Sequence, residues 1–313
     1  METTQTTQAT QAAQLPAGAQ MIDEVDLTPV RTYWQLVRLR FVRHRLAVIA
    51  FFLMVILVSA SILVPLLSGN AWAETSLERI NQPPSLLAPL GYDSLGINTF
   101  ARLMKGLQTS LFIGLSAVMV IVFVGVTIGA MAGFFGGWAD NALMRLVDVV
   151  LSIPTFFLIV MLVAFWGTGN VWVIIIAIGM TGWTTAARLV RADFLSLREA
   201  DFVAAAKALG ARDKRIVMRH MIPSAMAPVV VAATLGIADS VVVEASLSFL
   251  GFGINPPEAS LGNMLTKAQD YFYRDPLLAW YPGITLVLVV LAASFLGDGL
   301  RDALDPRQRI ESN

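Results

Sequence analysis

Long apolar stretches alternate with short polar ones along most of the chain, and this pattern predicts α-helices that cross a membrane. A helix needs about 20 apolar residues to cross about 30 Å of hydrocarbon. Six stretches meet this requirement to varying degrees, and they cover residues 46–67, 110–134, 147–166, 171–187, 223–250 and 281–296. The fold class that follows is an all-α membrane protein with six transmembrane helices.

The polar part of the chain before the first apolar stretch divides into two segments. Residues 1–30 begin with a tract of Gln, Thr and Ala that has no apolar periodicity, so we predict a disordered N-terminal tail. In residues 31–45, arginines alternate with aromatic and aliphatic side chains, which is typical of a helix in the membrane interface. The first apolar run comes too late and is too long for a signal peptide. Residues 46–309 then form the transmembrane domain.

Composition supports membrane integration and excludes several kinds of site. Apolar residues make up 56% of the chain, charged residues 14%, and the mean hydropathy is +0.69. The net charge is zero, so nothing suggests a nucleic-acid partner. The sequence contains no cysteine, and its two histidines are His44 and His220. We therefore expect no disulfide framework and no metal site in this chain.

The distribution of basic residues predicts the orientation. Seventeen of the 22 lysines and arginines fall in residues 31–45, 135–146, 188–219 and 301–309. Basic residues are retained on the cytoplasmic side of a membrane. We therefore predict that both termini are cytoplasmic and that residues 68–109 and 251–280 form the outer loops.

Two features inside the predicted spans suggest how the helices pack. Gly125, Gly129 and Gly133 recur every fourth residue along one helical face, which allows another helix to approach closely. Packing within this chain is favoured over an interface with a partner. Pro154 should kink the third span, because proline removes a backbone hydrogen bond.

The fifth span carries two acidic residues, Asp239 and Glu244. A charge near the bilayer centre costs about 2.5–3.5 kcal/mol on insertion scales, so neither side chain should face lipid. Five residues apart on a helix, they point about 140° away from each other. Each either lines a translocation path or pairs inside the bundle, and for Glu244 both alternatives are open.

The longest charged interruption between apolar regions, residues 191–222, is predicted to be a cytoplasmic loop. Good helix formers over 199–209, followed by Gly210, predict a short helix that ends at a left-handed glycine. We expect a second short helix to begin near Asp213 and to end before Pro223. The first helix carries a nearly bare surface of three consecutive alanines, so it is either a docking element for a partner or an ordinary connector.

This loop resembles the coupling loop of permease subunits in ABC-type importers, which reads Glu-Ala-Ala, three residues, Gly, nine residues and a hydrophobic ending with Pro. Ala204 stands where the family has glutamate, so any role of that carboxylate is either missing or taken by Glu199 or Asp201. The resemblance implies that the segment docks on an ATPase subunit. The residues it assigns to this contact are Asp201, Phe202, Ala204, Ala205, Ala206, Leu209, Gly210, Arg219, His220 and Pro223.

Two further motifs resemble the same family. Residues 244–253 read Glu-Ala-Ser-Leu-Ser-Phe-Leu-Gly-Phe-Gly and are followed by Pro256-Pro257, and the end of the chain, residues 296–307, resembles the closing motif of the group. Both are similar to the C-type permeases of dipeptide, oligopeptide and nickel importers. The implied fold is that of a type I ABC importer permease (MetI-like), with both termini inside. Residues 91–98 depart from the usual pattern on the outer side, as do Ala259 and Leu261, which leaves the substrate class open.

The resemblance also implies a function and a set of partners. The chain would form half of the translocation pore of an ATP-driven importer for dipeptides or oligopeptides, working by alternating access in a bacterial inner (cytoplasmic) membrane. Its partners would be a paralogous permease, two ATP-binding cassette ATPases, an extracytoplasmic substrate-binding protein and membrane lipid. Candidate pathway or gate residues are Asp93, Asp239, Glu244 and Ser248.

Energy for transport is expected to come from the partner subunits. None of the four lysines lies in a phosphate-binding Gly-x-x-x-x-Gly-Lys-Ser/Thr loop, so we expect ATP and Mg²⁺ to bind to the ATPases and no cofactor to bind here. The chain is therefore not expected to be an enzyme. The alternatives are a permease for nickel or another small solute and an ion-coupled secondary transporter, although we find no internal repeat.

Overall fold

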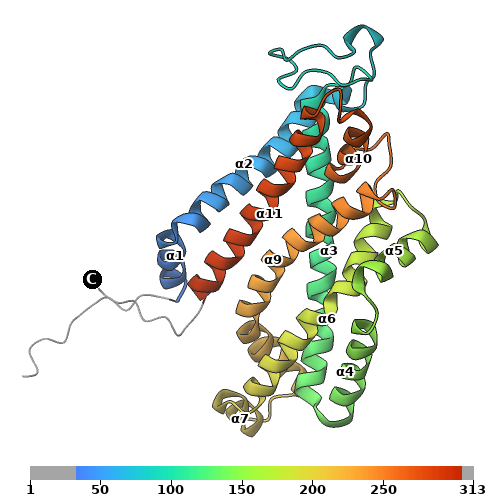
Figure 1. The fold of residues 1–313 in the computed structure, drawn as a ribbon. Helices are drawn as coiled ribbons and strands as arrows, with labels where there is room; N and C mark the ends of the chain where they lie inside the picture. Colours follow the sequence, from blue (N-terminus) through green and yellow to red (C-terminus); the bar gives the residue numbers. More distant parts are fainter. Residues whose placement is uncertain (1–32, 305–313) are drawn as a thin grey trace, which may run out of the picture.

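The computed structural model describes residues 33–304, so the predicted tail over 1–30 lies outside the described residues. The described chain is helical and contains no strand (Figure 1). Its helices are α1 (Tyr33–Arg43), α2 (Arg45–Ser68), α3 (Thr99–Phe135), α4 (Gly137–Leu151), α5 (Thr155–Trp166), α6 (Val171–Arg198), α7 (Asp201–Ala208), α8 (Asp213–Ile216), α9 (Ile222–Phe249), α10 (Leu261–Tyr271) and α11 (Leu277–Leu304). Short 3₁₀ turns cover Gly69–Trp72 and Leu77–Arg79, and a π-helical turn covers Val217–Met221.

The predicted all-α membrane fold is confirmed. Five helical stretches are long and apolar enough to cross a membrane, and the number rises to six when the bent pair formed by α4 and α5 is counted as one span. The five stretches are Arg45–Trp72, Thr99–Phe135, Val171–Arg198, Asp213–Phe249 and Leu277–Leu304. Several of these stretches extend beyond the predicted apolar runs. A helix continues into polar sequence as long as its backbone hydrogen bonds are formed and its side chains contact a neighbour or solvent.

The third span is broken at Pro154, and here the prediction of one kinked helix over 147–166 was wrong. The chain forms α4 and α5, which meet at an angle of 83°. Proline has no backbone N–H and its ring crowds the preceding turn, so Pro154 ends one helix and precedes the other. The first half also begins earlier than predicted, at Gly137.

The three regularly spaced glycines bring α3 into direct contact with α6, as predicted. A Cβ placed at Gly129 would lie 2.5 Å from the carbonyl oxygen of Ala187, and one at Gly133 would lie 2.5 Å from the Cβ of Phe194. One at Gly125 would lie 2.6 Å from the Cβ of a further α6 alanine. Only glycine permits this separation, so the motif serves packing within the chain.

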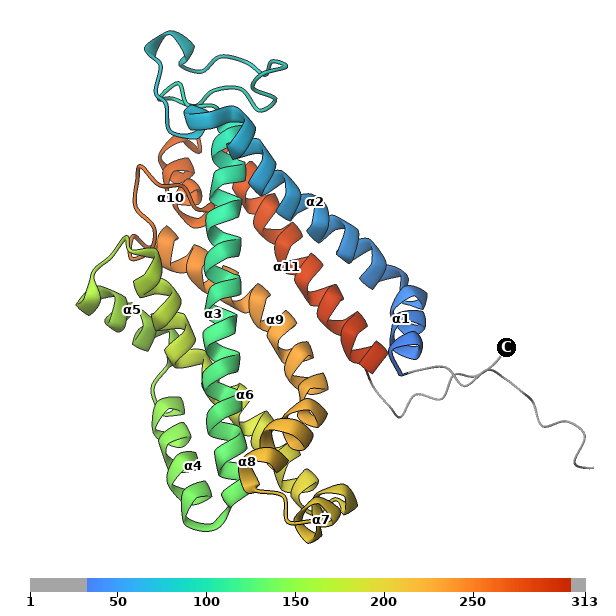
Figure 2. The ribbon, with the colours of Figure 1, turned by 180° about the vertical axis from the view of Figure 1, so that it is seen from behind.

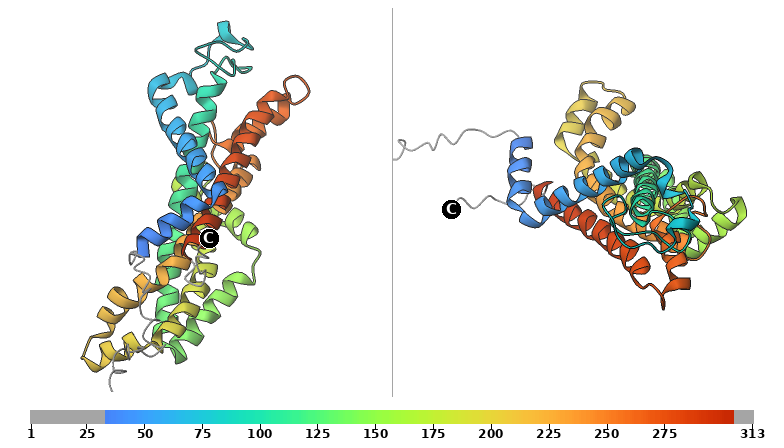
Figure 3. Two further views of the ribbon diagram at one scale, coloured as in Figure 1. Left: turned by 90° about the vertical axis from the view of Figure 1, so that its left-hand side faces the viewer. Right: turned by 90° about the horizontal axis from the view of Figure 1, so that it is seen from above.

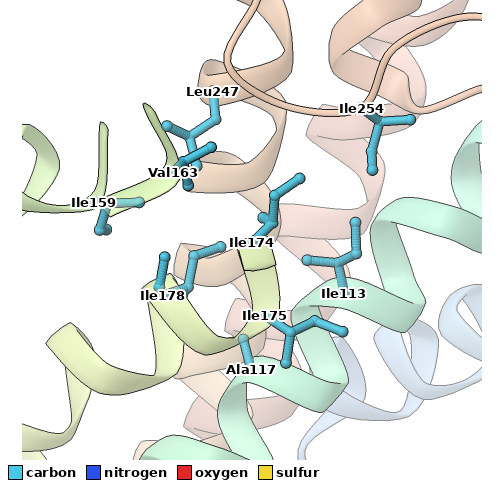
Figure 4. Packing of buried hydrophobic residues seen from close by; sticks show 10 residues of the cluster. Ile113, Ala117, Ile159, Val163, Ile174, Ile175, Ile178, Leu247 and Ile254 are labelled. Carbon is cyan, nitrogen blue, oxygen red and sulfur yellow. The ribbon is translucent and has the colours of Figure 1, made fainter. Parts of the chain in front are cut away.

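A buried aliphatic cluster joins the outer half of the bundle to α5 (Figure 4). Its members come from α3, α5, α6, α9 and the segment after α9, and nine are labelled in Figure 4: Ile113, Ala117, Ile159, Val163, Ile174, Ile175, Ile178, Leu247 and Ile254. The cluster attaches α5 beyond the break, so the bent pair packs as part of the bundle.

Helices α2 and α11 run side by side along the bundle (Figures 1 and 2). They approach closely enough that a Cβ at Gly299 would lie 2.1 Å from the Cβ of Ala47. The end of α11 lies beside α1 (Figure 3). There, His44 Nε2 is 3.6 Å from Asp302 Oδ2. The loop between α2 and α3 lies with α10 at the opposite end of the bundle from α7 (Figure 1).

Candidate functional site

The predicted docking helix exists as α7, a two-turn helix at one end of the bundle (Figure 1). Its C-terminus forms a Schellman motif, in which the Gly210 N–H donates to the Lys207 carbonyl at 2.9 Å and the Ala211 N–H donates to the Ala206 carbonyl at 3.0 Å. Gly210 has a φ of +76°, which confirms the left-handed position. The helix begins at Asp201 and not at Glu199, because residues 199 and 200 still close the last turn of α6.

One face of α7 is anchored to the bundle. Val203 is fully buried and packs in a cluster with Phe194 of α6, Ile216 of α8 and Met221 of the π-helical turn. A short helix is marginal by itself, so this contact holds it in place. The contact ties α7 to the end of α6 and to the helical stretch that leads into α9.

The opposite face of α7 is uncovered and carries apolar side chains beside the exposed Asp201. Ala204 and Ala205 are exposed, and beside them Phe202 is 41% exposed and Leu209 is 88% exposed. Small alanines flanked by two large apolar side chains give a surface that another backbone can approach closely. An exposed apolar surface of this kind is compatible with a docking element, and the docking role of these residues stays a prediction.

The chain continues from α8 into α9 without ending the helix, and the prediction of a stop before Pro223 was wrong. The π-helical turn Val217–Met221 bridges the two, with the Ile222 N–H donating to the Val217 carbonyl. Pro223 then falls in the first turn of α9, where a missing N–H costs little. Arg219 is exposed and His220 is half-buried in the π-helical turn, so both lie on the continuous helix that follows α7.

Glu244 lies at the other end of α9 and is completely buried, with 0% of its surface exposed. The Ser110 hydroxyl donates to Glu244 Oε2 at 2.6 Å, and the Ser248 hydroxyl donates to Oε1 at 2.7 Å. Each serine oxygen in turn accepts a backbone N–H, from Leu261 at 3.2 Å and from Ile254 at 2.9 Å. The carboxylate thus joins α3, α9 and the outer loop through two serines.

Glycines in the outer motif allow this cluster to close. A Cβ at Gly253 would lie 2.0 Å from Ser248 Oγ, and one at Gly262 would lie 2.2 Å from the Ala245 carbonyl oxygen. Helix α10 begins directly beside them with a capping box formed by Ser260 and Asn263. Glycine is therefore required at positions 253 and 262 for the outer loop to pack on the end of α9.

Asp239 lies apart from Glu244, in a cavity of about 430 Å³ between α3, α6 and α9. Hydroxyl groups share the wall with it, among them those of Thr155, Thr181 and Ser240. The break between α4 and α5 borders the same cavity through Leu151 and Thr155. Apolar side chains make up most of the remaining wall, so the carboxyl and hydroxyl groups form a polar patch in a largely apolar cavity.

Asp93, the fourth pathway candidate, belongs to neither group. It lies in the loop before α3, where its Oδ1 accepts the backbone N–H groups of Leu95 and Ile97, both at 2.9 Å. It lines a separate outer cavity together with Arg102 and Lys267. The structure therefore brings Glu244 and Ser248 together and places Asp239 and Asp93 elsewhere.

Several residues of these sites were not singled out from the sequence. Ser260 and Asn263 carried a recognisable signal, because a serine followed three residues later by an amide is the pattern of a capping box. Ser110 carried none, since it lies 134 residues from Glu244 in the sequence. The sequence did not indicate that Arg102 is buried, because its burial depends on contacts that form only in the folded chain.

Comparisons with known proteins agree with this arrangement. Residues 125–310 match a family described as binding-protein-dependent transport system inner membrane component, and residues 32–84 match the N-terminal transmembrane domain of oligopeptide transport permease C. A solved structure titled as an inward-facing conformation of the MetNI methionine ABC transporter shares the fold. It has a TM-score of 0.54 at 20% identity and covers 65% of this chain and 96% of that chain.

Curated relatives cover nearly the whole chain. The oligopeptide transport system permease protein OppC of Mycobacterium bovis is 36% identical over 86% of this chain and 93% of its own length. The glutathione transport system permease protein GsiD of Pectobacterium atrosepticum is 37% identical over 90% and 92%, respectively. The dipeptide transport system permease protein DppC of Alkalihalophilus pseudofirmus is 35% identical over 85% and 88%. The chain belongs to the binding-protein-dependent transport system inner membrane components, the permease subunits of ABC importers, which are not enzymes and work with ATPase and substrate-binding partners.

Proposed function

We propose that this chain forms half of the translocation pore of an ATP-driven importer that carries peptides by alternating access. The observation that carries the proposal is α7, whose bare apolar face is uncovered while its other face is anchored in the bundle. The substrate class rests on the relatives, which are named for oligopeptide, dipeptide and glutathione transport. Membership in the family supports a bacterial inner membrane as the location.

The second half of the pore would be a paralogous permease that covers an apolar groove between α3 and α9. The groove has a volume of about 830 Å³, and its wall includes the exposed side chains of Met119, Phe123 and Phe135. Asp213 and Lys214 line its end next to α7, so the groove adjoins the docking element. A partner seated there would share the groove and lie beside the same ATPases.

Two ATPase subunits would bind ATP and Mg²⁺, because this sequence has no phosphate-binding loop of its own. One of them would hold α7, and the other would hold the equivalent helix of the paralogous permease. An extracytoplasmic binding protein would deliver the substrate at the end of the bundle opposite α7. With these subunits present, the chain itself needs no cofactor.

The helices offer a direct mechanical route from the ATPase to the outer loop. A pull on α7 acts through Val203 on the Ile216–Met221 cluster, which belongs to the continuous helical stretch Asp213–Phe249. The far end of this stretch carries Glu244, whose serine partners hold α3 and the outer loop. Closure of the ATPases would therefore tilt α9 and move the outer loop with it, which opens one side as the other closes.

The test is to purify the chain with its natural partners and to identify, by mass spectrometry, what the binding protein retains. We expect short peptides, and we expect ATP hydrolysis by the complex to rise when the loaded binding protein is added. A nickel chelate or another non-peptide solute in the binding protein would overturn the substrate class. Failure of the ATPases to copurify with the chain would overturn the coupling function.

A further inference from the structure

A second polar cavity, of about 200 Å³, lies at the end of the bundle opposite α7. Its walls come from the loop before α3, the first turn of α3, helix α10 and the start of α11, which meet near the top of Figure 1. Polar side chains in these walls include Asp93, Thr99, Arg102, Lys267 and Asp270. None of them belongs to the Glu244 cluster or to the cavity at Asp239.

Arg102 is an unusual member of this cavity because it is buried but not fully paired. Only 4% of its surface is exposed, and neither Nε nor Nη2 has a hydrogen-bond partner among residues 33–304. The Oγ1 of Thr99, one turn earlier on the same helix, is likewise buried without a partner. A buried guanidinium is costly unless an acceptor satisfies its N–H groups. The two side chains, which both belong to the wall of this cavity, therefore carry donors that no residue among 33–304 satisfies.

Two cationic and two acidic side chains line this cavity. Lys267 is half-buried on α10, and burial together with the charge of Arg102 lowers the pKa of its ammonium. Asp93 is the nearby counter-charge, but its Oδ1 is already occupied by two backbone N–H groups. Asp270 is exposed at the edge of the cavity. Two cations therefore share a small space in which one oxygen of Asp93 is occupied by backbone N–H groups and Asp270 is exposed to solvent.

The site is held rigidly before any ligand arrives. Asn98 caps α3 by accepting the N–H groups of Phe100 and Ala101, both at 3.1 Å, and its Nδ2 donates to the Leu87 carbonyl at 3.0 Å. Gly96 lies so close to Ser76 that a Cβ would sit 1.9 Å from the Ser76 carbonyl oxygen. The first turn of α3 is thus fixed by its loop, which is the preorganisation that binding sites require.

We propose that this cavity is a binding site for a single carboxylate group that enters from the extracytoplasmic side. The planar fork of Arg102 offers two parallel N–H groups to the two carboxylate oxygens, the Thr99 hydroxyl adds a third donor, and Lys267 contributes charge. The carboxylate has one of two sources. It belongs either to a small solute, such as the C-terminus of a peptide, or to an acidic side chain that reaches the cavity through unbranched methylene groups. The proposal does not depend on the transport function, since the chain alone contains the whole site.

The test is a ligand-observed NMR titration of the full chain in lipid nanodiscs, at constant ionic strength. The ligands are acetate, trialanine with a free carboxylate and trialanine amide. We expect acetate to bind and the amide to show no binding. If trialanine binds as well as acetate, the site is assigned to the C-terminus of a solute. If acetate alone binds, the site is assigned to the carboxylate of an acidic side chain with unbranched methylene groups. Equal binding of trialanine and its amide would overturn the proposal.

Variants connect the binding to the cavity. Arg102→Gln should weaken acetate binding at least tenfold, and Arg102→Lys should recover part of it because it keeps the charge but loses the fork. Lys267→Gln, on the half-buried edge, should weaken binding several-fold even if the Arg102 variants fold poorly. Arg274→Gln is the matched control, since this arginine is exposed in the same outer segment and does not line the cavity.

A chemical readout provides an independent check. Lys267 should be acetylated by a water-soluble reagent in the free protein, and saturating acetate should slow this reaction without slowing modification of the exposed Lys207 on α7. Unchanged acetate affinity in both Arg102→Gln and Lys267→Gln would overturn the proposal. Modification of Lys267 at the same rate with and without acetate would do so as well.

Discussion

Replacement of Ala205 by arginine tests the docking role of α7 with little disturbance of the chain itself. Ala205 is exposed on the side of α7 away from the buried Val203, so an arginine there meets no neighbour in this subunit. Exposed substitutions of this kind change the free energy of unfolding by no more than about 0.5 kcal/mol. Membrane insertion and thermal stability of Ala205→Arg should therefore match those of the wild type.

The effect in the complex should be much larger. If α7 packs in a groove of the ATPase, the added side chain overpacks a contact suited to a methyl group, which costs about 1–3 kcal/mol. Because 1.4 kcal/mol is a factor of ten in affinity, the ATPase should bind about 5- to 150-fold more weakly. Burial of an unpaired guanidinium charge would raise this loss further.

The assay is a titration of purified ATPase against the permease complex in nanodiscs, with peptide uptake measured in parallel. The matched control is Ala142→Arg on α4, where the alanine is exposed and Arg145 shows that the helix already carries an exposed arginine. We expect Ala205→Arg to lose ATPase affinity and uptake and Ala142→Arg to keep both. Wild-type affinity and uptake in Ala205→Arg would refute the docking assignment, and α7 would then be only a connector.

Three further predictions concern orientation, the buried carboxylate and helix packing. Reporter fusions after Arg212 should respond as cytoplasmic and fusions after Asp270 as external, and the reverse pattern would contradict the orientation. Glu244→Gln replaces one of the two acceptor oxygens by an NH2 group, so one serine hydroxyl loses its buried acceptor and the melting temperature should fall by the equivalent of about 1–3 kcal/mol; an unchanged value would show that the serine contacts contribute little. Gly129→Val places a branched side chain against a carbonyl oxygen 2.5 Å from the new Cβ, so it should destabilise the chain by at least about 1–3 kcal/mol in thermal unfolding, and a stable variant would contradict the close contact of α3 and α6.

Features governed by local chemistry were predicted well from the sequence. The left-handed Gly210 at the end of α7 follows from the helix formers before it, and the glycine spacing that joins α3 to α6 follows from the helical repeat alone. The spans with long apolar runs were also found, with the start of α2 at Arg45 and the end of α9 at Phe249 close to the predicted limits. Apolar length and helical periodicity are sufficient to fix these elements.

The effects of prolines on helices were predicted less well, because they depend on how the backbone preference of proline competes with the packing of the neighbouring helices. Pro154 signalled a disturbance, but an 83° break instead of a kink depends on where α5 finds its partners in the aliphatic cluster. Pro223 looked like a helix stop, yet the π-helical turn before it widens the backbone and lets the helix continue. A proline in a first turn and a proline that ends a helix have the same sequence signature.

Contacts between residues that are far apart in the sequence could not be predicted from the sequence pattern. Glu244 was recognised as costly in lipid, but the serine that satisfies Oε2 lies on α3, and nothing near Ser110 indicates that pairing. Whether Glu244 also contributes to a transport pathway stays a prediction, since its two hydrogen bonds show how it is held and not what passes beside it. Arg102 could be identified only from its burial, which arises from the outer loop folding over α3.

Reconstitution of the purified complex in proteoliposomes tests the central claim most directly, because it separates ATP-driven import from ion-coupled transport. Labelled peptide and the binding protein are placed on the outer side, ATP is enclosed, and no ion gradient is applied. The account predicts peptide accumulation that requires ATP and the ATPase subunits and that is abolished in Ala205→Arg. Accumulation driven by an ion gradient in the absence of the ATPases would contradict it.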